Sequence, residues 1–201
     1  MRTGVFGGTF DPPHVGHLIL AEEALAQLGL GRVLWVLTPD PPHKQERRIA
    51  PLADRYAMLL AAVAGNPSFE ISRVDIDRSP PHYALDTVQL LAQENPSDEL
   101  YYLMGSDSLR DLPTWHRPDQ FVQACHALGV MRRAGVCLDL DGLEAVIPGL
   151  KAKVCWIEVP LIEIASSSIR ERVARGEPYR YYLPPAVFEY IRQHYLYQPA
   201  E

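Results

Sequence analysis

Two glycines and two histidines lie close together near the start of the chain, in the stretch "GVFGGTFDPPHVGHL" that runs from Gly4 to Leu18. Gly7 and Gly8 follow a short apolar run, and His14 and His17 stand three residues apart after an Asp-Pro-Pro turn. Three structures fit such a pattern: a metal site, a site that holds phosphate, or an ordinary corner between a strand and a helix.

The phosphate site explains the most residue types. Glycine leaves no side chain to keep a ligand off the backbone, and it also permits positive φ. Residues three apart share one face of a helix. A helix N-terminus offers backbone N–H groups and a positive dipole end, both of which favour anions. We therefore expect the glycines to cradle a phosphate and His14 and His17 to donate to it from the start of a helix.

The competing sites find less support. Two histidines are too few for a zinc site, and no third ligand has a clear place in the sequence. The three cysteines, Cys125, Cys137 and Cys155, are far apart and form no CxxC pair, which indicates neither a zinc site nor a disulfide framework. The opening stretch also differs from the GxGxxG dinucleotide motif, which argues against a redox Rossmann protein, and from the GxxxxGK[ST] P-loop.

Composition bounds the class of protein. The chain has 201 residues, of which 47% are hydrophobic, and its net charge is -6. This length predicts a single domain over residues 1–201. The acidic balance argues against a general nucleic-acid binder. We see no run of about 18 apolar residues that could span a membrane and no signal peptide, so we expect a cytoplasmic protein with reduced thiols.

The elements that must position these residues follow from hydrophobic periodicity. A helix should open near His14 and end before Gly29, and "SLRDL" after residue 105 could form a further short helix. We expect strands over residues 3–6, 32–39, 69–76, 99–105, 126–133 and 153–160, and further helices over 51–65, 84–95, 119–125, 139–150, 166–176 and 184–194.

This alternation predicts an α/β fold: a Rossmann-like open parallel sheet with helices on both faces, and a small C-terminal helical region over about residues 160–201. The strands are apolar runs, as is typical when both faces of a sheet are covered. Proline pairs at 12–13, 41–42 and 80–81 each follow an expected strand. Loops at the carboxyl ends of parallel strands line the ligand crevice of such sheets, which places the opening stretch at that crevice.

The stretch "GGTFDPPHVGHL" resembles the motif of the HxGH nucleotidyltransferase superfamily, with His14-Val15-Gly16-His17 as the HxGH residues. The chain is more narrowly similar to the bacterial nicotinate-nucleotide adenylyltransferases, and the resemblance covers nearly its whole length. It is carried by "PPHK" (41–44), "PHYALDT" (81–87), "GSDSLRDLPTWHR" (105–117), "SSSIRERV" (166–173) and "YLPPAVFEYIRQHYLY" (182–197).

The resemblance implies a reaction. The 5′-phosphate of nicotinate mononucleotide attacks the α-phosphorus of ATP, which gives deamido-NAD and pyrophosphate. Such transfers need positioning and neutralisation of negative charge rather than covalent help. Mg²⁺ is expected to arrive with ATP, held by phosphates and water rather than by a protein cage. ATP and nicotinate mononucleotide are the implied partners, and the chain is expected to be a monomer or a homodimer.

The same resemblance assigns the ATP side of the site. Two further segments join the opening stretch there: Gly105 and Asp107, which follow the fourth strand, and a serine run that should cap a helix and place Arg170 as a fixed cation. Asp107 could also cap the helix over "SLRDL", which is compatible with a ligand role, and the serine run could instead open an ordinary capped helix with a surface arginine. The implied catalytic residues are His14 and His17, and the implied ATP contacts are Gly7, Gly8, Thr9, Phe10, Gly105, Asp107, Ser166, Ser167, Ser168, Ile169 and Arg170.

The acceptor side follows in the same way. In the family the tryptophan at position 115 stacks on the pyridine ring, and backbone N–H groups near 83–84 and 115–116 hold its carboxylate. Lys44 and Arg133 are candidates for the mononucleotide phosphate, although Lys44 could be a solvated lysine in the polar run "HKQERR". The implied acceptor contacts are Lys44, Tyr83, Ala84, Thr87, Trp115, His116 and Arg133.

The chain departs from the family pattern at three positions. It has Ala84 where threonine is common, His116 where tyrosine is common, and Ala134 where proline is usual. Backbone donors survive the first two changes, and our hypothesis is that His116 adds a donor near the pyridine carboxylate.

Other functions on this scaffold compete with the one that the resemblance implies. A related adenylyltransferase could use nicotinamide mononucleotide or phosphopantetheine, although "PPHK" and Trp115 count against phosphopantetheine. A protein that senses nucleotides without catalysis is a further alternative, because fold does not fix function. Against it stands the presence of both His14 and His17, which a pure sensor need not keep.

Overall fold

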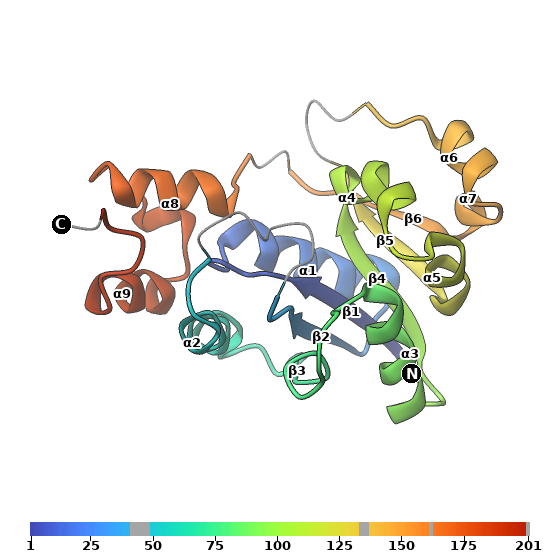
Figure 1. Cartoon of the computed structure of the whole chain (residues 1–201), viewed down its shortest axis with the longest axis horizontal. Helices are drawn as coiled ribbons and strands as arrows, with labels where there is room; N and C mark the ends of the chain where they lie inside the picture. Colours follow the sequence, from blue (N-terminus) through green and yellow to red (C-terminus); the bar gives the residue numbers. More distant parts are fainter. Residues whose placement is uncertain (41–48, 133–136, 161–162, 200–201) are drawn as a thin grey trace.

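The computed structural model describes residues 1–40, 49–132, 137–160 and 163–199 (Figure 1). The described strands are β1 (Arg2–Gly8), β2 (Arg32–Leu37), β3 (Phe69–Ser72), β4 (Glu99–Gly105), β5 (Ala127–Met131) and β6 (Val154–Ile157). The described helices are α1 (Val15–Leu28), α2 (Leu52–Val63), α3 (Ala84–Glu94), α4 (Ser106–Asp111), α5 (Pro118–Ala124), α6 (Leu140–Val146), α7 (Leu150–Lys153), α8 (Ser166–Ala174) and α9 (Pro185–Gln193), with short 3₁₀ turns η1 (Leu112–Thr114) and η2 (Arg180–Tyr182).

The strands form one parallel sheet in the order β3-β2-β1-β4-β5-β6, which confirms the predicted fold class. The chain first adds strands on one side of β1 and then crosses to the other side at β4. Ligands of open α/β sheets bind at this reversal, beyond the carboxyl ends of the strands. Gly8 ends β1 and Gly105 ends β4, so both lie at the reversal.

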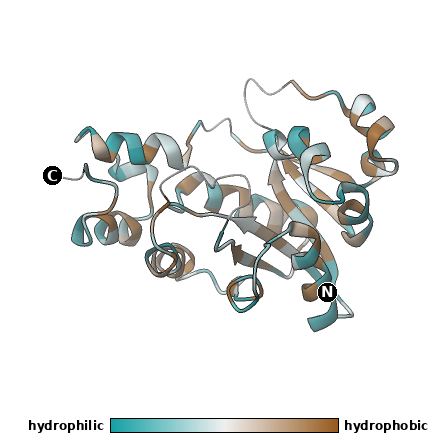
Figure 2. Cartoon of the chain, viewed as in Figure 1, coloured by the Kyte–Doolittle hydropathy of each residue, from teal (hydrophilic) through white to brown (hydrophobic). Residues whose placement is uncertain are grey.

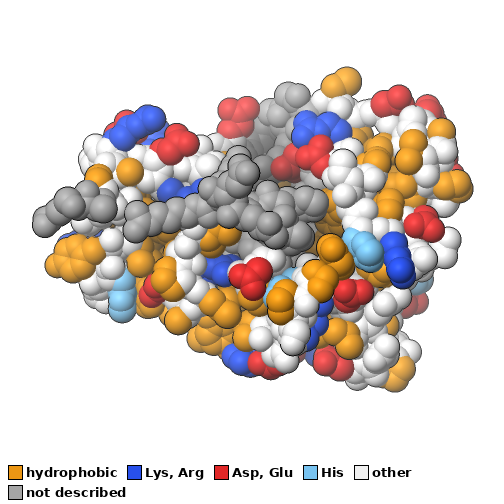
Figure 3. All heavy atoms as spheres, in the orientation of Figure 1, with side chains coloured by type: hydrophobic (Ala, Val, Ile, Leu, Met, Phe, Trp, Pro, Cys, Tyr) orange, Lys and Arg blue, Asp and Glu red, His pale blue; other side chains and the backbone are white. Residues whose placement is uncertain are grey.

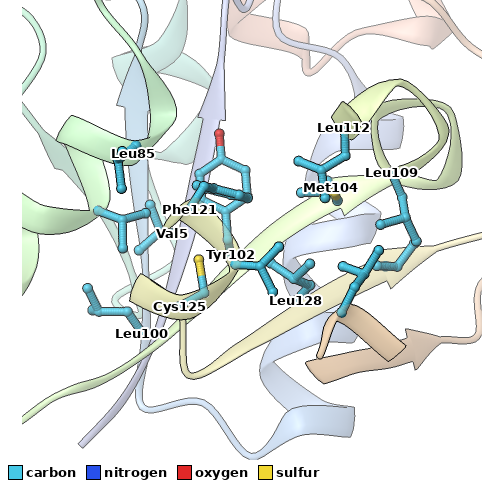
Figure 4. Close-up of a cluster of buried hydrophobic side chains, with 14 of the residues drawn as sticks. Val5, Leu85, Leu100, Tyr102, Met104, Leu109, Leu112, Phe121, Cys125 and Leu128 are labelled. Carbon is cyan, nitrogen blue, oxygen red and sulfur yellow. The ribbon is translucent and has the colours of Figure 1, made fainter. Parts of the chain in front are cut away.

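Alternation along the strands divides the core into two layers, because successive strand residues face opposite sides of a sheet. Val5 and Tyr102 pack in the layer with α3 to α7, whereas Phe6 and Trp35 pack in the layer with α1 and α2. Figure 4 shows part of the first layer, with Tyr102 among side chains from the sheet and its covering helices. The hydrophobic colouring of the strands in Figure 2 agrees with a sheet covered on both faces.

The C-terminal helices form a third cluster with α2. Ile169 of α8 and Val187 and Ile191 of α9 pack with Met58 and Ala62 of α2. Figure 1 shows α8 and α9 beside α2, at the end of the molecule away from α6 and α7. The shared core fixes α8 relative to α2, which matters for the site described below.

The strand expected over residues 69–76 is wrong beyond Ser72. Residues 74–77 form a turn in which the Asp77 amide donates to the carbonyl of Arg73 at 2.9 Å. The sequence carries the reason: Phe69 and Ile71 are the apolar residues of an odd-numbered face, but apolar residues resume at even positions with Val74. A strand cannot change phase in this way without a break.

One further helical expectation needs correction, and another is confirmed. The helix expected over 139–150 is interrupted after Val146, and Gly149 has a φ of 87°, a left-handed conformation that glycine tolerates without strain. "SLRDL" does lie in a helix, since α4 and η1 occupy most of the connection between β4 and Trp115.

The surface mixes charges of both signs. On the face shown in Figure 3, acidic and basic side chains are interspersed rather than gathered into one stripe. Among the residues that the structure describes, every helix is too short or too polar to cross a membrane.

Candidate active site

A cavity of about 430 Å³ lies at the carboxyl ends of β1 and β4. Its walls come from the N-terminal ends of α1, α3, α4 and α8, so residues from both ends of the chain meet there. The predicted site residues in these walls are Gly7, Gly8, Thr9, Phe10, His14, His17, Tyr83, Ala84, Thr87, Gly105, Asp107, Trp115, His116, Ser166, Ser167 and Arg170.

His14 and His17 occupy the first turn of α1, as predicted. His14 is the N-cap residue, and its backbone N–H donates to Nδ1 of His17 at 3.1 Å. Because Nδ1 accepts this hydrogen bond, it carries no proton, and the ring N–H of His17 is at Nε2. The two rings stack with their centroids 3.6 Å apart. Two imidazolium charges at that separation would repel by about 4–5 kcal/mol at an effective dielectric constant near 20, so a neutral His17 suits the stack.

Gly16 makes the histidine stack possible. A Cβ atom at Gly16 would lie 3.2 Å from Nδ1 of His14 and 3.3 Å from its Cε1. These contacts are tighter than most Cβ contacts in proteins, so a side chain at this position would require the His14 ring to shift by a few tenths of an ångström. The glycine of the HxGH motif thus has a local role: it leaves room for the first histidine to lie over the second.

Gly7 and Gly8 are required for space rather than for an unusual backbone conformation. Neither has positive φ, so the conformational freedom that we expected of them is not used. A Cβ at Gly7 would lie 2.6 Å from the Tyr102 hydroxyl, and one at Gly8 would lie 2.9 Å from the Phe10 ring. Phe10 itself has a φ of 45°, and its ring packs 5.3 Å from that of Trp35. Phe10 therefore lines the cavity while anchoring the loop in the core.

Asp11 follows Phe10 and was predicted only as part of a rigid turn. Its carboxylate is buried, and Oδ1 accepts the Tyr197 hydroxyl at 2.7 Å and, at 3.4 Å, the backbone N–H of Ala50. Its other oxygen, Oδ2, forms an ion pair with Nη1 of Arg170 at 3.6 Å, and the same Nη1 donates to the Asp11 carbonyl at 2.6 Å. Asp11 therefore ties the loop after β1 to α8 and to the C-terminal tail.

The N-terminus of α8 differs from the expected capped helix. Ala165 is the N-cap residue, so the serines occupy the first turn rather than the cap, and Ser166 Oγ donates to the carbonyl of Pro12 at 2.9 Å. Ser168 is exposed, and the Ile169 side chain is buried in the cluster with α2. Neither residue lines the cavity. Only one face of α8 can point into the cavity, because another face must pack against α2.

The end of β4 supplies the next part of the wall. Gly105 is the N-cap residue of α4, and Asp107 lies in the first turn of that helix and lines the cavity. The alternative in which Asp107 caps the helix is therefore wrong, because the helix already begins at Ser106.

Tyr83 and Trp115 bound the far end of the cavity. Tyr83 is the N-cap residue of α3, and the His116 ring stacks on the Tyr83 ring with centroids 4.1 Å apart and planes 15° apart. Trp115 is backed by the core, since its ring lies 5.2 Å from that of Phe121. The start of α3 therefore opens into the cavity beside a rigid aromatic wall.

A charged pair, formed by the buried Asp75 and the half-buried Arg78, supports this end of the site. Asp75 Oδ1 accepts the Thr87 hydroxyl at 2.8 Å and Nε of Arg78 at 2.9 Å, and Nη2 of Arg78 donates to the Tyr83 carbonyl at 3.3 Å. The Thr87 hydroxyl, predicted to contact the acceptor, is thus engaged by Asp75. Sequence reasoning missed Asp75 because it placed this residue in a strand.

Comparison with known proteins places the chain. The cytidylyltransferase-like family model matches residues 5–172. A probable nicotinate-nucleotide adenylyltransferase from Thermomicrobium roseum is 49% identical over 200 residues, which cover 100% of this chain and 93% of the relative. The chain belongs to the nicotinate-nucleotide adenylyltransferase family. A relative of the same description from Roseiflexus castenholzii is 43% identical over 98% of both chains.

Solved structures of nicotinate-nucleotide adenylyltransferases share the fold of this family member. The Plasmodium falciparum nicotinic acid mononucleotide adenylyltransferase complexed with NaAD superimposes with a TM-score of 0.79 at 17% identity, over 98% of this chain and 97% of the other. A putative nicotinate-nucleotide adenylyltransferase from Vibrio parahaemolyticus gives a TM-score of 0.70 at 16% identity, over 99% and 96%.

Arg55 is another residue of this adenylyltransferase family member that the sequence analysis did not single out. It is buried in α2 and donates to the carbonyls of Ala50 at 3.0 Å, Thr9 at 3.1 Å, Thr38 at 2.8 Å and Pro39 at 2.7 Å. Burial lowers the pKa of Arg55, and the nearby negative charge of Asp11 opposes that shift. The signal was present in the sequence: Arg55 stands three, four and seven residues before Met58, Leu59 and Ala62, on the apolar face of its helix.

Two predicted acceptor contacts, Lys44 and Arg133, lie outside the described residues, as does Ala134. Within the ranges that the structure describes, histidine, cysteine, aspartate and glutamate side chains form no group of three or more that could hold a metal ion.

Proposed function

We propose that this protein transfers the adenylyl group of ATP to the 5′-phosphate of nicotinate mononucleotide. An oxygen of the mononucleotide phosphate bonds to the α-phosphorus, the bond from that phosphorus to the bridging oxygen breaks, and pyrophosphate leaves with the electron pair. The observation that carries the proposal is the stacked histidine pair at the start of α1, which shares one cavity with Arg170 of α8. Full-length similarity to nicotinate-nucleotide adenylyltransferases supports the choice of substrates.

On the ATP side we assign to His17 and His14 the stabilisation, by hydrogen bonds, of negative charge on the phosphates. The hydrogen bond to Nδ1 of His17 holds the ring so that its Nε2–H is the donor for a phosphate oxygen. Backbone groups of Gly7 and Gly8 would lie against the phosphates, Arg170 and Ser167 would hold the triphosphate, and Gly105 and Asp107 would meet the ribose.

On the acceptor side we assign the pyridine ring to the face of Trp115, since aromatic faces suit such stacking. Its carboxylate would meet the N-terminus of α3 at Tyr83 and Ala84, where backbone N–H groups and the helix dipole favour an anion. His116, stacked on Tyr83, would add a side-chain donor. Lys44 and Arg133 remain our candidates for the mononucleotide phosphate.

Mg²⁺ fits this site as a companion of ATP. Among the residues that the structure describes, the cavity walls contain the carboxylates of Asp11, Asp75 and Asp107. Arg170 pairs with Asp11 and Arg78 pairs with Asp75. Mg²⁺ usually keeps several waters and binds substrate phosphates. We therefore propose that phosphate oxygens and water hold the ion, which would neutralise charge on the triphosphate, and we assign no residue of this chain as its ligand.

The reaction can be tested directly. The purified protein is mixed with ATP and Mg²⁺, each acceptor is offered in turn, and pyrophosphate release is followed together with the dinucleotide product. Release with nicotinate mononucleotide, at a kcat/KM well above that with nicotinamide mononucleotide or phosphopantetheine, is the expected result. A preference for another acceptor would reassign the substrate, and ATP binding without pyrophosphate release from any acceptor would favour a nucleotide sensor.

The setting of the reaction is also a proposal. The three cysteines, which all lie in described parts of the chain, are unpaired, and free thiols are typical of a reducing compartment, so we place the enzyme in the cytoplasm. We propose that it acts as a monomer or homodimer, which sedimentation of the purified protein would decide.

A further inference from the structure

A tyrosine from the C-terminal tail reaches the loop that follows β1. Tyr197 lies beyond the end of α9, and its hydroxyl donates to Oδ1 of Asp11 at 2.7 Å. Its φ is 64°, a conformation that non-glycine residues seldom adopt and that persists only when the surroundings hold it. The Leu196 amide donates to the Ile191 carbonyl at 3.1 Å, which turns the tail back onto its own helix. The conformation of the tail therefore places the Tyr197 hydroxyl against Asp11.

The two oxygens of Asp11 have different partners. Oδ1 accepts the Tyr197 hydroxyl, whereas Oδ2 faces Nη1 of Arg170 at 3.6 Å, which is too long for a direct hydrogen bond. The Arg170 nitrogen instead donates to the Asp11 carbonyl at 2.6 Å. The carboxylate is thus held so that it attracts Arg170 without closing a tight pair, and Arg170 stays at the cavity wall.

We propose that Tyr197 is a positioning residue for ATP: by occupying one oxygen of Asp11, it keeps the carboxylate from turning onto Arg170 and so keeps the guanidinium available to the triphosphate. The inference rests on the proposed role of Arg170 in binding ATP. Without the hydroxyl, Oδ1 would be left buried with the weaker contact from the Ala50 amide at 3.4 Å, and a buried carboxylate in that position gains most by closing on the nearest cation.

The structure offers a matched control in the same region. Tyr190 of α9 donates to Oδ1 of Asp54 in α2 at 2.9 Å. This is also a tyrosine–aspartate hydrogen bond from the C-terminal region, but it reaches α2 rather than the loop that follows β1. Neither Tyr190 nor Asp54 lines the cavity. A purely structural role for such bonds predicts the same consequences for Tyr190→Phe and Tyr197→Phe.

The experiment compares the two phenylalanine variants with the wild type. We expect Tyr197→Phe to raise the KM for ATP by roughly three- to tenfold, since only part of the contribution of a hydrogen bond to a charged group reaches Arg170. The KM for nicotinate mononucleotide should change by less than about twofold on that reasoning, because the shift acts through the triphosphate. Both variants should lower the melting temperature, because each loses a tyrosine–aspartate hydrogen bond, but Tyr190→Phe should leave both KM values unchanged.

A double-mutant cycle tests the route through Arg170. In an Arg170→Lys background, the effect of Tyr197→Phe on the KM for ATP should largely disappear, because the two residues act on one interaction. Two results would overturn the proposal: equal KM values for ATP in Tyr197→Phe and Tyr190→Phe, or an unchanged effect of Tyr197→Phe in the Arg170→Lys background. Turnover by the wild type would still uphold the proposed function in either case. If the wild type did not turn over, the Kd for ATP, measured by calorimetry on the same variants, would decide the inference by the same comparison.

Discussion

Replacing His17 by alanine removes structural contacts and a proposed ligand contact at once. Nδ1 no longer accepts the His14 amide, and the Nε2–H donor that we assign to the ATP phosphates is lost. The first loss, together with the ring stack at 3.6 Å, should cost about 1–3 kcal/mol of folding free energy, from typical values for a capping bond and an aromatic pair. Domains are usually stable by about 5–15 kcal/mol, so the variant should remain folded.

The second loss should appear in the rate. Removing one donor from developing charge in a transition state typically costs about 10²- to 10³-fold in kcat, or about 2.7–4 kcal/mol. We therefore expect His17→Ala to fold, to bind nicotinate mononucleotide and to turn over a hundredfold or more slowly, on the same estimate.

Glutamate at position 17 separates the two effects. A glutamate at the third position of a helix can accept the N-cap amide, so His17→Glu should recover most of the melting temperature lost in His17→Ala. An ionised carboxylate carries no donor, so the kcat of this variant should stay low. Melting curves and pyrophosphate release measured on both variants provide the test. A glutamate variant with nearly normal kcat would show that His17 acts only through the helix cap, and our assignment of the donor would be wrong.

Three further predictions concern other parts of the molecule. His116→Ala should raise the KM for nicotinate mononucleotide by roughly tenfold, as the loss of one charged hydrogen bond predicts. The control is His194→Ala, which removes a similar ring stack on Tyr190, with centroids 4.1 Å apart, and should leave this KM unchanged. Equal KM values in the two variants would exclude the donor role of His116. Gly16→Ala should displace the His14 ring, because the new Cβ would lie 3.2 Å from Nδ1, and should lower kcat with a smaller effect on the melting temperature; an unchanged kcat would contradict our reading of the stack. Burial would raise the pKa of Asp98, but hydrogen bonds from the Thr3 hydroxyl, the amino terminus and Arg32 outweigh burial and lower it. Stability from this carboxylate should therefore be fully present above about pH 4, near the ordinary aspartate pKa, and should be lost at lower pH. In urea unfolding, the difference in unfolding free energy between the wild type and Asp98→Asn should shrink as the pH falls below that value. A difference that stays constant with pH would refute the linkage.

The fold could be predicted because each strand and helix carries its own periodicity. The apolar strands and the short connections between them fix a parallel sheet without knowledge of the tertiary contacts. The errors occurred where two local patterns meet, as at Ser72, where the apolar phase changes, and at Gly149, where a helix is interrupted. Hydrophobic periodicity is judged over several consecutive residues, so a break at a single residue does not appear in it.

The site divides in a similar way. Motif residues such as His14, His17 and Trp115 could be placed in the cavity from sequence because their types and spacing are specific. Arg55 and Asp75 could not, because their importance lies in partners that are distant along the chain. A buried charge takes its meaning from the carbonyls or cations that surround it, and these are known only after the chain has folded.

The four carbonyls on Arg55 have a consequence for how such enzymes can diversify. One side chain fixes Pro39 and Ala50, which stand on either side of the segment 41–48, to the same point beside Thr9. Because both ends are pinned to a shared anchor, the chain length between them can change at small cost: doubling a loop adds only about 0.6 kcal/mol of closure entropy. Insertions or deletions within residues 41–48 can thus leave the loop that follows β1 in its position.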